Sequence, residues 1–183
     1  MTKRADQKFE RITQDKYYTP PSAIAPLLPH LQPKTRFIEP CAGDGRLAAY
    51  LNIKGHRCVW ACDIDPDSPD IQRMNALDIQ PTFIAKLRID CFITNPPWER
   101  SILHALITFL PTMAPTWLLF DADWMHTDFG RRFGRHCSAI VSVGRVKWIE
   151  GSKHQGFDNA AWFLFNAAHR GQPRFYWNGG APK

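Results

Sequence analysis

The feature that most restricts the fold of this chain is the alternation of short apolar runs with stretches of helical periodicity. The apolar runs predict strands at Thr35–Glu39, Arg57–Ile64, Asn75–Asp78, Ile89–Thr94, Thr116–Phe120, Ala139–Trp148 and Ala160–Phe165. Helices are predicted between them at Ser22–Leu28, Arg46–Ile53, Pro69–Met74 and Glu99–Leu110. This order is typical of a doubly wound α/β fold, with seven strands in a mostly parallel sheet and helices on both faces. The last two strands are close enough in sequence to form an antiparallel hairpin at the edge.

Length and composition favour a single domain. The 183 residues contain no internal repeat or linker, so we expect one domain over residues 1–183, with a polar, mobile leader at residues 1–16. No apolar run approaches the roughly 18 residues that a membrane span needs. The N-terminus is too polar for a secretory signal peptide. We therefore expect a soluble, cytoplasmic protein that does not bind a membrane.

The cysteines and the charge restrict the chemistry. An odd count of five cysteines without a signal peptide argues against a disulfide framework. Cys58 and Cys62 are four residues apart, but no second Cys or His pair stands at a zinc-like distance, so no metal site is predicted. The formal net charge of +6 fits a polyanionic partner, although a solvated basic face gives the same pattern. The basic clusters consist of Lys3, Arg4, Lys8 and Arg11, and of Arg131, Arg132, Arg135 and His136.

The residues that end the strands are the candidates for a site, because ligands collect at the carboxyl ends of the strands in such folds. The first strand ends in the turn Glu39–Gly45 (EPCAGDG). Its two glycines let the backbone turn tightly toward a ligand, and the next helix offers its amide end. A dinucleotide-binding turn would carry a third glycine, which is absent here, and a plain strand-to-helix turn also fits.

Two acidic residues end the next two strands. Asp63 follows the glycine turn by about 20 residues, a spacing at which a carboxylate accepts hydrogen bonds from ribose hydroxyls. Asp78 ends the third predicted strand, where its carboxylate is suited to the exocyclic amine of an adenine ring. A role for Asp78 as a turn residue or helix cap is the alternative.

The segment Asn95-Pro96-Pro97-Trp98 follows a buried apolar strand and has the most specific chemistry in the chain. An aromatic amine is a poor nucleophile because its lone pair is delocalised into the ring. Acceptors that hold the amine hydrogens out of the ring plane localise that lone pair, and the Asn95 side-chain oxygen and the Pro96 carbonyl are suitable acceptors. The prolines fix the backbone torsions, and Trp98 offers a flat face to a base. These four residues are the candidate catalytic residues.

With these motifs the chain resembles the S-adenosylmethionine-dependent amino-methyltransferases, in particular the gamma-ordered adenine-N6 DNA methyltransferases. The resemblance covers roughly Tyr17–Phe165, and the cofactor motif precedes the Asn-Pro-Pro-aromatic motif as in that family. It implies a Rossmann-like class I methyltransferase fold, S-adenosyl-L-methionine as cofactor, and transfer of a methyl group to N6 of adenine in DNA. Small enzymes of this kind without a recognition domain are similar to those carried by phages and prophages.

The resemblance also assigns roles to residues. Tyr18-Thr19-Pro20-Pro21 is similar to the segment that the family folds over the methionine end of the cofactor, which implies that Thr19 contacts the cofactor carboxylate. Asp63 would hold the ribose hydroxyls and Asp78 the adenine amine. The cofactor-binding residues implied in this way are Tyr18, Thr19, Glu39, Cys41, Ala42, Gly43, Gly45, Asp63, Ile64 and Asp78.

On the substrate side, Gln155–Asp158 resembles the loop whose aromatic residue stacks on a flipped-out base, which would place the target between Phe157 and Trp98. A hydrophobic anchor under the hairpin is the alternative for Phe157. The family's separate recognition domain does not follow the last strand, so we expect loops or a partner to supply a short or relaxed sequence specificity. The implied substrate contacts are Trp98, Phe157 and, toward phosphates, Arg131, Arg132 and Arg135.

Alternatives to a DNA methyltransferase remain at this stage. Amino-methyltransferases that act on RNA adenine or on protein glutamine carry the same turn, more often with Tyr or Phe in place of Trp98. The positive charge favours nucleic acid over protein but does not separate DNA from RNA. A non-catalytic nucleic-acid-binding partner subunit that kept the fold is the alternative from another class, although such subunits typically lose the glycine turn or the Asn-Pro-Pro residues. The sequence predicts neither the recognition site nor the oligomeric state.

Overall fold

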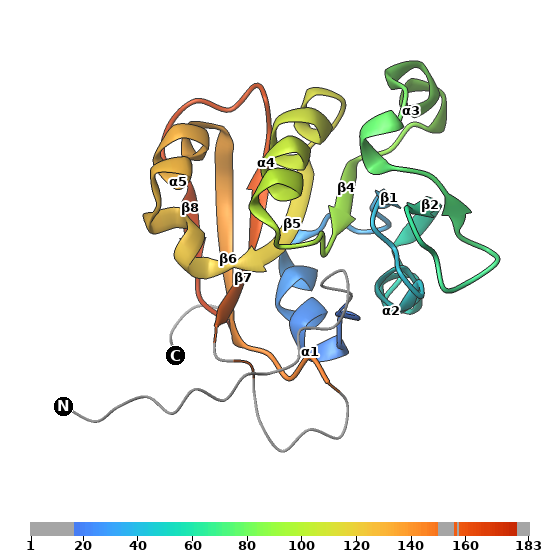
Figure 1. The fold of residues 1–183 in the computed structure, drawn as a ribbon, viewed down its shortest axis with the longest axis horizontal. Helices are drawn as coiled ribbons and strands as arrows, with labels where there is room; N and C mark the ends of the chain where they lie inside the picture. Colours follow the sequence, from blue (N-terminus) through green and yellow to red (C-terminus); the bar gives the residue numbers. More distant parts are fainter. Residues whose placement is uncertain (1–16, 150–155, 157, 179–183) are drawn as a thin grey trace.

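One mixed sheet runs through the computed structural model, which describes residues 17–149, 156 and 158–178 (Figure 1). The described residues form eight strands in the order β3-β2-β1-β4-β5-β7-β6-β8. The predicted leader, residues 1–16, and Phe157 lie outside the described residues. The strands are β1 (Arg36–Glu39), β2 (Arg57–Asp63), β3 (Gln72–Arg73), β4 (Cys91–Thr94), β5 (Thr116–Asp121), β6 (Cys137–Arg145), β7 (Asn159–Phe165) and β8 (Arg174–Tyr176).

Neighbouring residues of the strands face opposite sides of the sheet and build two cores. Ile38, Phe92 and Leu118 belong to one hydrophobic cluster, with α3 (Pro81–Leu87), α4 (Arg100–Phe109) and the 3-10 helix η5 (Ala122–His126) packed on it. The residues Phe37, Ile93 and Leu119 belong to the other cluster, with α1 (Pro21–Ile24), the 3-10 helix η2 (Ala25–His30) and α2 (Arg46–Ile53). Because side chains alternate across a strand, the continuous apolar runs of the sequence are explained by burial on both faces.

The strand directions confirm the predicted α/β class with a mostly parallel sheet. β1 pairs in parallel with β2 and β4, and β4 pairs in parallel with β5. β7 is antiparallel to both β5 and β6, which confirms the predicted antiparallel pair. β7 lies between β5 and β6, so the pair does not form the outer edge. That edge is β8, an eighth strand that pairs in parallel with β6.

Two predicted elements between β2 and β4 are wrong. The predicted helix Pro69–Met74 instead contains β3, which pairs with Cys62 and Asp63 of β2. The predicted strand Asn75–Asp78 is the 3-10 helix η3 (Ala76–Asp78), because the Asn75 side chain accepts a hydrogen bond from Leu77 N and caps a helical turn. Four residues are too few for a hydrophobic period to decide between the two structures.

Other elements were not predicted, since they are short and lack a clear period. They are α3, α5 (Asp128–Phe133), β8, and the 3-10 helices η4 (Leu110–Thr112), η5 and η6 (Gly134–His136). The predicted helix Ser22–Leu28 corresponds to α1 followed by η2, with a proline at the start of each. Within the described part of the chain, none of the helices is long and apolar enough to cross a membrane.

The sheet order brings three predicted strand ends together. β1 lies between β2 and β4, and all three run in the same direction. The glycine turn after β1, Asp63 at the end of β2 and Asn95 after β4 therefore lie at one edge of the sheet, where parallel α/β folds bind ligands.

Candidate functional site

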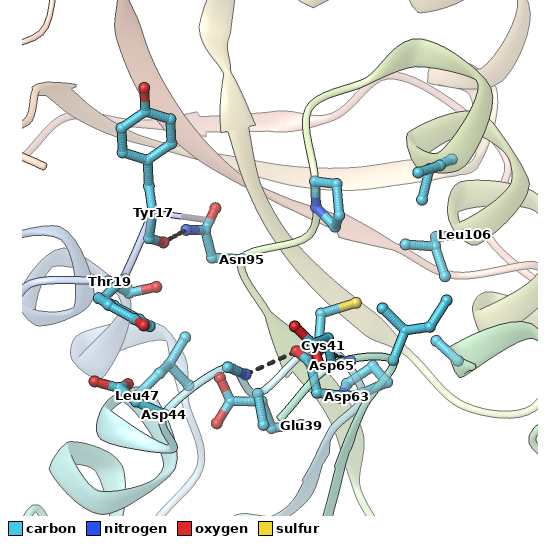
Figure 2. A pocket seen from close by; sticks show the side chains of 18 of the residues that line it. Tyr17, Thr19, Glu39, Cys41, Asp44, Leu47, Asp63, Asp65, Asn95 and Leu106 are labelled. Atoms are coloured by element: carbon cyan, nitrogen blue, oxygen red, sulfur yellow. Dashed lines mark hydrogen bonds between the residues drawn. The ribbon is translucent and has the colours of Figure 1, made fainter. Parts of the chain in front are cut away.

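A cavity of about 640 Å³ opens at the carboxyl ends of β1, β2 and β4. Its size lies within the range of small-molecule and cofactor sites. In Figure 2, Asn95 and Tyr17 lie on one side of the cavity, and Glu39 and Asp63 on the opposite side. We refer to the second side, formed by the turn after β1 and the end of β2, as the glycine-turn wall, and to the first as the Asn95 wall.

The turn after β1 depends on two glycines in the left-handed region of backbone conformation. Gly43 has a φ of 54° and Gly45 a φ of 81°, values that are strained for residues with a side chain. Gly45 immediately precedes α2, and Gly43 N donates a hydrogen bond to Asp63 Oδ2 at 2.8 Å. The ring of Tyr18 lies 3.6 Å from the position that a Cβ on Gly43 would take. The turn therefore presents backbone to the cavity and is packed on both sides.

Asp63 accepts one backbone hydrogen bond on each oxygen of its carboxylate. Oδ2 accepts from Gly43 N and Oδ1 accepts from Asp65 N, both at 2.8 Å (Figure 2). A carboxylate has about four acceptor positions, so each oxygen keeps one for a ligand. Because Asp63 lines the cavity, this arrangement is suited to a ligand with two adjacent hydroxyl groups.

The cavity is acidic. Glu39 is 2% exposed, and its Oε2 accepts a hydrogen bond from Ala48 N at 2.9 Å. Burial raises the pKa of Glu39 well above its ordinary value, and the neighbouring carboxylates of Asp44 and Asp63 act in the same direction. The basic side chain that lines the cavity, Arg46, is paired with Asp44 through a 2.7 Å Nε–Oδ2 contact. The cavity therefore favours a cationic ligand over an anionic one.

The residues Tyr17–Thr19 connect the two walls of the cavity. Tyr18 Oη donates to Asp67 Oδ2 at 2.6 Å, and the Arg46 guanidinium lies 4.7 Å from the centre of the Tyr18 ring. These contacts join Tyr18 to the glycine-turn wall. Thr19 is buried, and the carbonyl of Tyr17 accepts a hydrogen bond from Asn95 Nδ2 at 3.1 Å. One short segment thus contacts both sides of the site.

The amide of Asn95 is held at both ends. Nδ2 donates to Tyr17 O, and Oδ1 accepts from Trp98 Nε1 at 3.2 Å. A carbonyl accepts only from the NH2 group and an indole N–H donates only to the oxygen, so the two partners together fix the orientation of the amide. The carbonyl oxygen Oδ1 has a second lone pair, which remains for a substrate amine.

The predicted site residues divide between the cavity and its surroundings. Gly45, Pro96 and Trp98 belong to the same turns without lining the cavity. Asp78 is exposed and also lies off the lining, and the preceding residues Asn75–Leu77 line it instead. Arg131, Arg132 and Arg135 are exposed on α5 and η6, away from the cavity. The predicted residues that line the cavity are Tyr18, Thr19, Glu39, Cys41, Ala42, Gly43, Asp63, Ile64, Asn95 and Pro97.

Sequence reasoning missed several residues of the site. Tyr17 lines the cavity directly before the predicted Tyr18, and Ile102 and Leu106 of α4 line it from the helix face that the sequence identifies only as apolar. Trp148 lies edge-on to Trp98, with ring centres 5.6 Å apart at 90°. No pattern could have selected Trp148, because it follows β6 and reaches Trp98 only through the fold.

The cysteines are free, protonated thiols. All five are free, and burial is the main factor that raises the pKa of each thiol: Cys58 to about 11, and Cys62, Cys91 and Cys137 to about 12. Burial also raises the pKa of Cys41, which lines the cavity as a neutral thiol. Among the described residues, no group of three or more His, Cys, Asp and Glu side chains could hold a metal ion.

Comparisons with known proteins identify the fold. No family model and no curated protein matches the chain. A candidate RNA methyltransferase from Pyrococcus horikoshii aligns with a TM-score of 0.56 and 14% identity, over 84% of this chain and 87% of its own. The 23S rRNA methyltransferase ErmE aligns with a TM-score of 0.53 and 16% identity, over 84% of this chain and 70% of its own.

A third similar structure is the methyltransferase subunit of a type I restriction-modification system from Streptococcus thermophilus. It aligns with a TM-score of 0.54 and 9% identity, over 84% of this chain and 45% of its own. Identities this low carry information about the fold alone. The chain therefore has the α/β fold that these methyltransferases share.

Proposed function

We propose that this protein transfers a methyl group from S-adenosyl-L-methionine to N6 of adenine in DNA. The observation that carries the proposal is that Asn95 and Pro97 line the same cavity as Gly43 and Asp63. A donor bound on the glycine-turn wall and an amine held at Asn95 would meet in one enclosed space. The fold shared with nucleic acid methyltransferases supports the same reaction class.

The cavity fits this cofactor better than it fits a dinucleotide. S-adenosylmethionine carries a sulfonium and an ammonium group, and the carboxylates of Asp44 and Asp63 line the cavity. A pyrophosphate would be repelled by the same carboxylates. The two free acceptor positions of Asp63 suit the ribose hydroxyls, and the apolar side chains of Ile64 and Leu77 suit the faces of an adenine ring. When bound, the cofactor supplies an electrophilic methyl group.

The Asn95 wall would activate the target amine. Oδ1 of Asn95, which lines the cavity, would accept one amine hydrogen, and the carbonyl of Pro96 in the same turn would accept the other. The nitrogen lone pair is then directed at the methyl carbon. The rigid turn keeps these acceptors in position before the substrate arrives, because the prolines restrict the backbone torsions. After transfer the methylated amine would release one proton to solvent. Trp98 supplies an aromatic face against which a base can stack.

We infer a nucleic acid substrate from the positive charge of the chain, and adenine as the target from the turn Asn95–Trp98. The chain has a net charge of +6, and Arg132 and Arg135 are exposed cations suited to phosphate contacts. We expect a short or degenerate sequence context.

The test offers DNA, RNA and a glutamine-containing protein in parallel with radiolabelled S-adenosylmethionine. We expect label in DNA, with N6-methyladenine and not N4-methylcytosine after digestion to nucleosides, at positions that share at most a few bases. Label in RNA or protein alone would contradict the DNA assignment. Equal labelling by an Asn95→Ala variant would contradict the assigned catalytic turn.

A further inference from the structure

A second cluster of polar side chains lies at the opposite end of the sheet from the cavity. The imidazole of His136, directly before β6, has one guanidinium on each ring nitrogen. Arg135 Nε donates to Nε2 at 3.0 Å, and Arg170 Nη1 lies 3.3 Å from Nδ1. Arg135 belongs to η6 and Arg170 to the turn after β7, so two segments far apart in the chain bring their cations together.

This cluster has no counter-charge among the described residues. Among the described residues, ion pairs join Arg46 to Asp44, Arg73 to Asp65 and Arg131 to Asp128. None of these pairs includes Arg135 or Arg170. Burial and the two guanidinium groups lower the pKa of His136, and no carboxylate acts against them. Two cations on one neutral ring repel each other, and an anion bound between them would relieve the repulsion.

The guanidinium groups are oriented and keep donors for a ligand. Arg170 Nη1 also donates to the carbonyl oxygens of Ala167 at 2.6 Å and His169 at 2.7 Å, which fixes the plane of the group. Its Nε and Nη2, and both terminal nitrogens of Arg135, make no hydrogen bond to the described residues. The buried Nε2 of the adjacent His169 also has no partner there. A guanidinium fork of this kind matches the geometry of a phosphate group.

The position of the cluster indicates the size of its ligand. β6 runs for nine residues from the cluster toward the cavity edge, which separates its ends by roughly 26 Å. Because β5 and β7 lie between β4 and β6, the distance from the cluster to the cavity exceeds this length. A duplex rises about 3.4 Å per base pair, so a ligand that reaches both places needs more than roughly eight base pairs. The segment between β5 and β6 crosses the same span and carries the exposed Arg131 and Arg132 on α5 (Figure 1).

We propose that Arg135, His136 and Arg170 form an anion site that binds a backbone phosphate of a polynucleotide whose target base is at the cavity. Arg174, exposed at the start of β8 and paired with Ala139 of β6, extends the cationic surface at this end. The identity of the occupant rests on the proposed function, since a nucleic acid substrate is long enough to reach both places. The cluster anchors the backbone without reading a base.

The test measures binding of fluorescently labelled duplex DNA by anisotropy, without methyl donor. A duplex of about 24 base pairs spans the cavity and the cluster, whereas one of about 6 base pairs does not. Arg135→Gln and Arg170→Gln are each compared with Arg57→Gln, which removes an equal charge from an exposed residue at the start of β2. Midpoints of thermal unfolding confirm that each variant is folded.

We expect Arg135→Gln and Arg170→Gln to raise the Kd for the long duplex roughly three- to tenfold, as removal of a charge-assisted hydrogen bond does. The slope of log K against log salt should fall by about 0.9 for each phosphate that the variant no longer neutralises. The advantage of the long duplex over the short one should shrink in both variants. An effect no larger than that of Arg57→Gln would overturn the site.

The occupant is tested with polyglutamate as competitor. Displacement by polyglutamate as efficient as by unlabelled duplex would overturn the assignment to a nucleic acid backbone. The assay needs no turnover, so the two proposals fail separately. Absence of methyl transfer with cluster-dependent binding intact would contradict the proposed function alone. If the protein methylated DNA but Arg135→Gln and Arg57→Gln had the same Kd for the long duplex, the anion site alone would be contradicted.

Discussion

The two walls of the cavity are held together in different ways. On the glycine-turn wall, Asp63 accepts hydrogen bonds from Gly43 and Asp65, residues within 20 positions of it in the chain. On the Asn95 wall, the side-chain amide of Asn95 depends on Tyr17, 78 positions away, and on Trp98. The first wall is built from local contacts of the sheet. The second is complete only when the segment Tyr17–Thr19 lies across the cavity. The position of the Asn95 amide is therefore coupled to a segment that also contacts the glycine-turn wall.

The largest expected effect separates chemistry from cofactor binding. Asn95→Ala removes an acceptor aimed at the reacting amine and should lower turnover by roughly a hundredfold or more, with cofactor affinity nearly unchanged. Asn95→Asp keeps an acceptor oxygen and should be milder. It should still fall short of the parent, because the donor to Tyr17 O is removed. Single-turnover kinetics measures the turnover rate, and calorimetry measures the cofactor affinity. If Asn95→Ala lowered both, the two walls would not act separately.

The next effect concerns the glycine-turn wall. Asp63→Ala removes the acceptor of two backbone amides and of the proposed ribose hydroxyls, and should weaken S-adenosylmethionine binding by about 1–3 kcal/mol. Asp70→Ala is the matched control, since Asp70 is an exposed carboxylate outside the cavity lining. Titration calorimetry measures both. Equal affinities of the two variants would remove Asp63 from the site.

A smaller effect tests whether Trp98 positions Asn95. Trp98→Phe keeps an aromatic face but removes the N–H that holds Asn95 Oδ1, so we expect kcat to fall roughly three- to tenfold with little change in KM. Trp148→Phe alters the neighbouring indole in the same way without removing a hydrogen bond to Asn95. If the two variants had the same kcat, the role of Trp98 would be limited to stacking.

The smallest expected effect is on stability and follows from the raised pKa of Glu39. The folded protein favours the neutral carboxyl, so this contribution to the free energy of unfolding is complete below the ordinary pKa and is lost as pH rises through the raised one. The parent should therefore lose stability as pH rises from the ordinary pKa of a glutamate through the raised pKa of Glu39. Glu39→Gln stays neutral and should lose less. Denaturant unfolding across this range measures the free energy of unfolding of the parent and of Glu39→Gln. If the two proteins showed the same dependence on pH, an ionisation cost at Glu39 would be contradicted.

The fold and the glycine-turn wall were accessible from sequence because their signals are local. Apolar runs predicted six of the strands, and the parallel order predicted that Gly43, Asp63 and Asn95 share one edge of the sheet. The segment after β2 was not accessible, since a four-residue pattern at Asn75–Asp78 fits a strand and a helical turn equally well. There the side chain of Asn75 decided for the turn by capping it.

The sequence by itself determined the α/β class, the turns after β1 and β4, and the side chains that we propose as reactive groups. These depend on side-chain chemistry and on periods of a few residues. Only the tertiary structure decided the partners of those groups. Tyr17 contacts Asn95, Trp148 packs on Trp98, and Arg170 contacts His136, which is 34 positions away in the chain. These residues are neighbours because the order of the strands in the sheet differs from their order in the sequence. Hydrogen bonds and ring contacts act over a few ångströms of space, whatever the distance along the chain, and so no local pattern contains them.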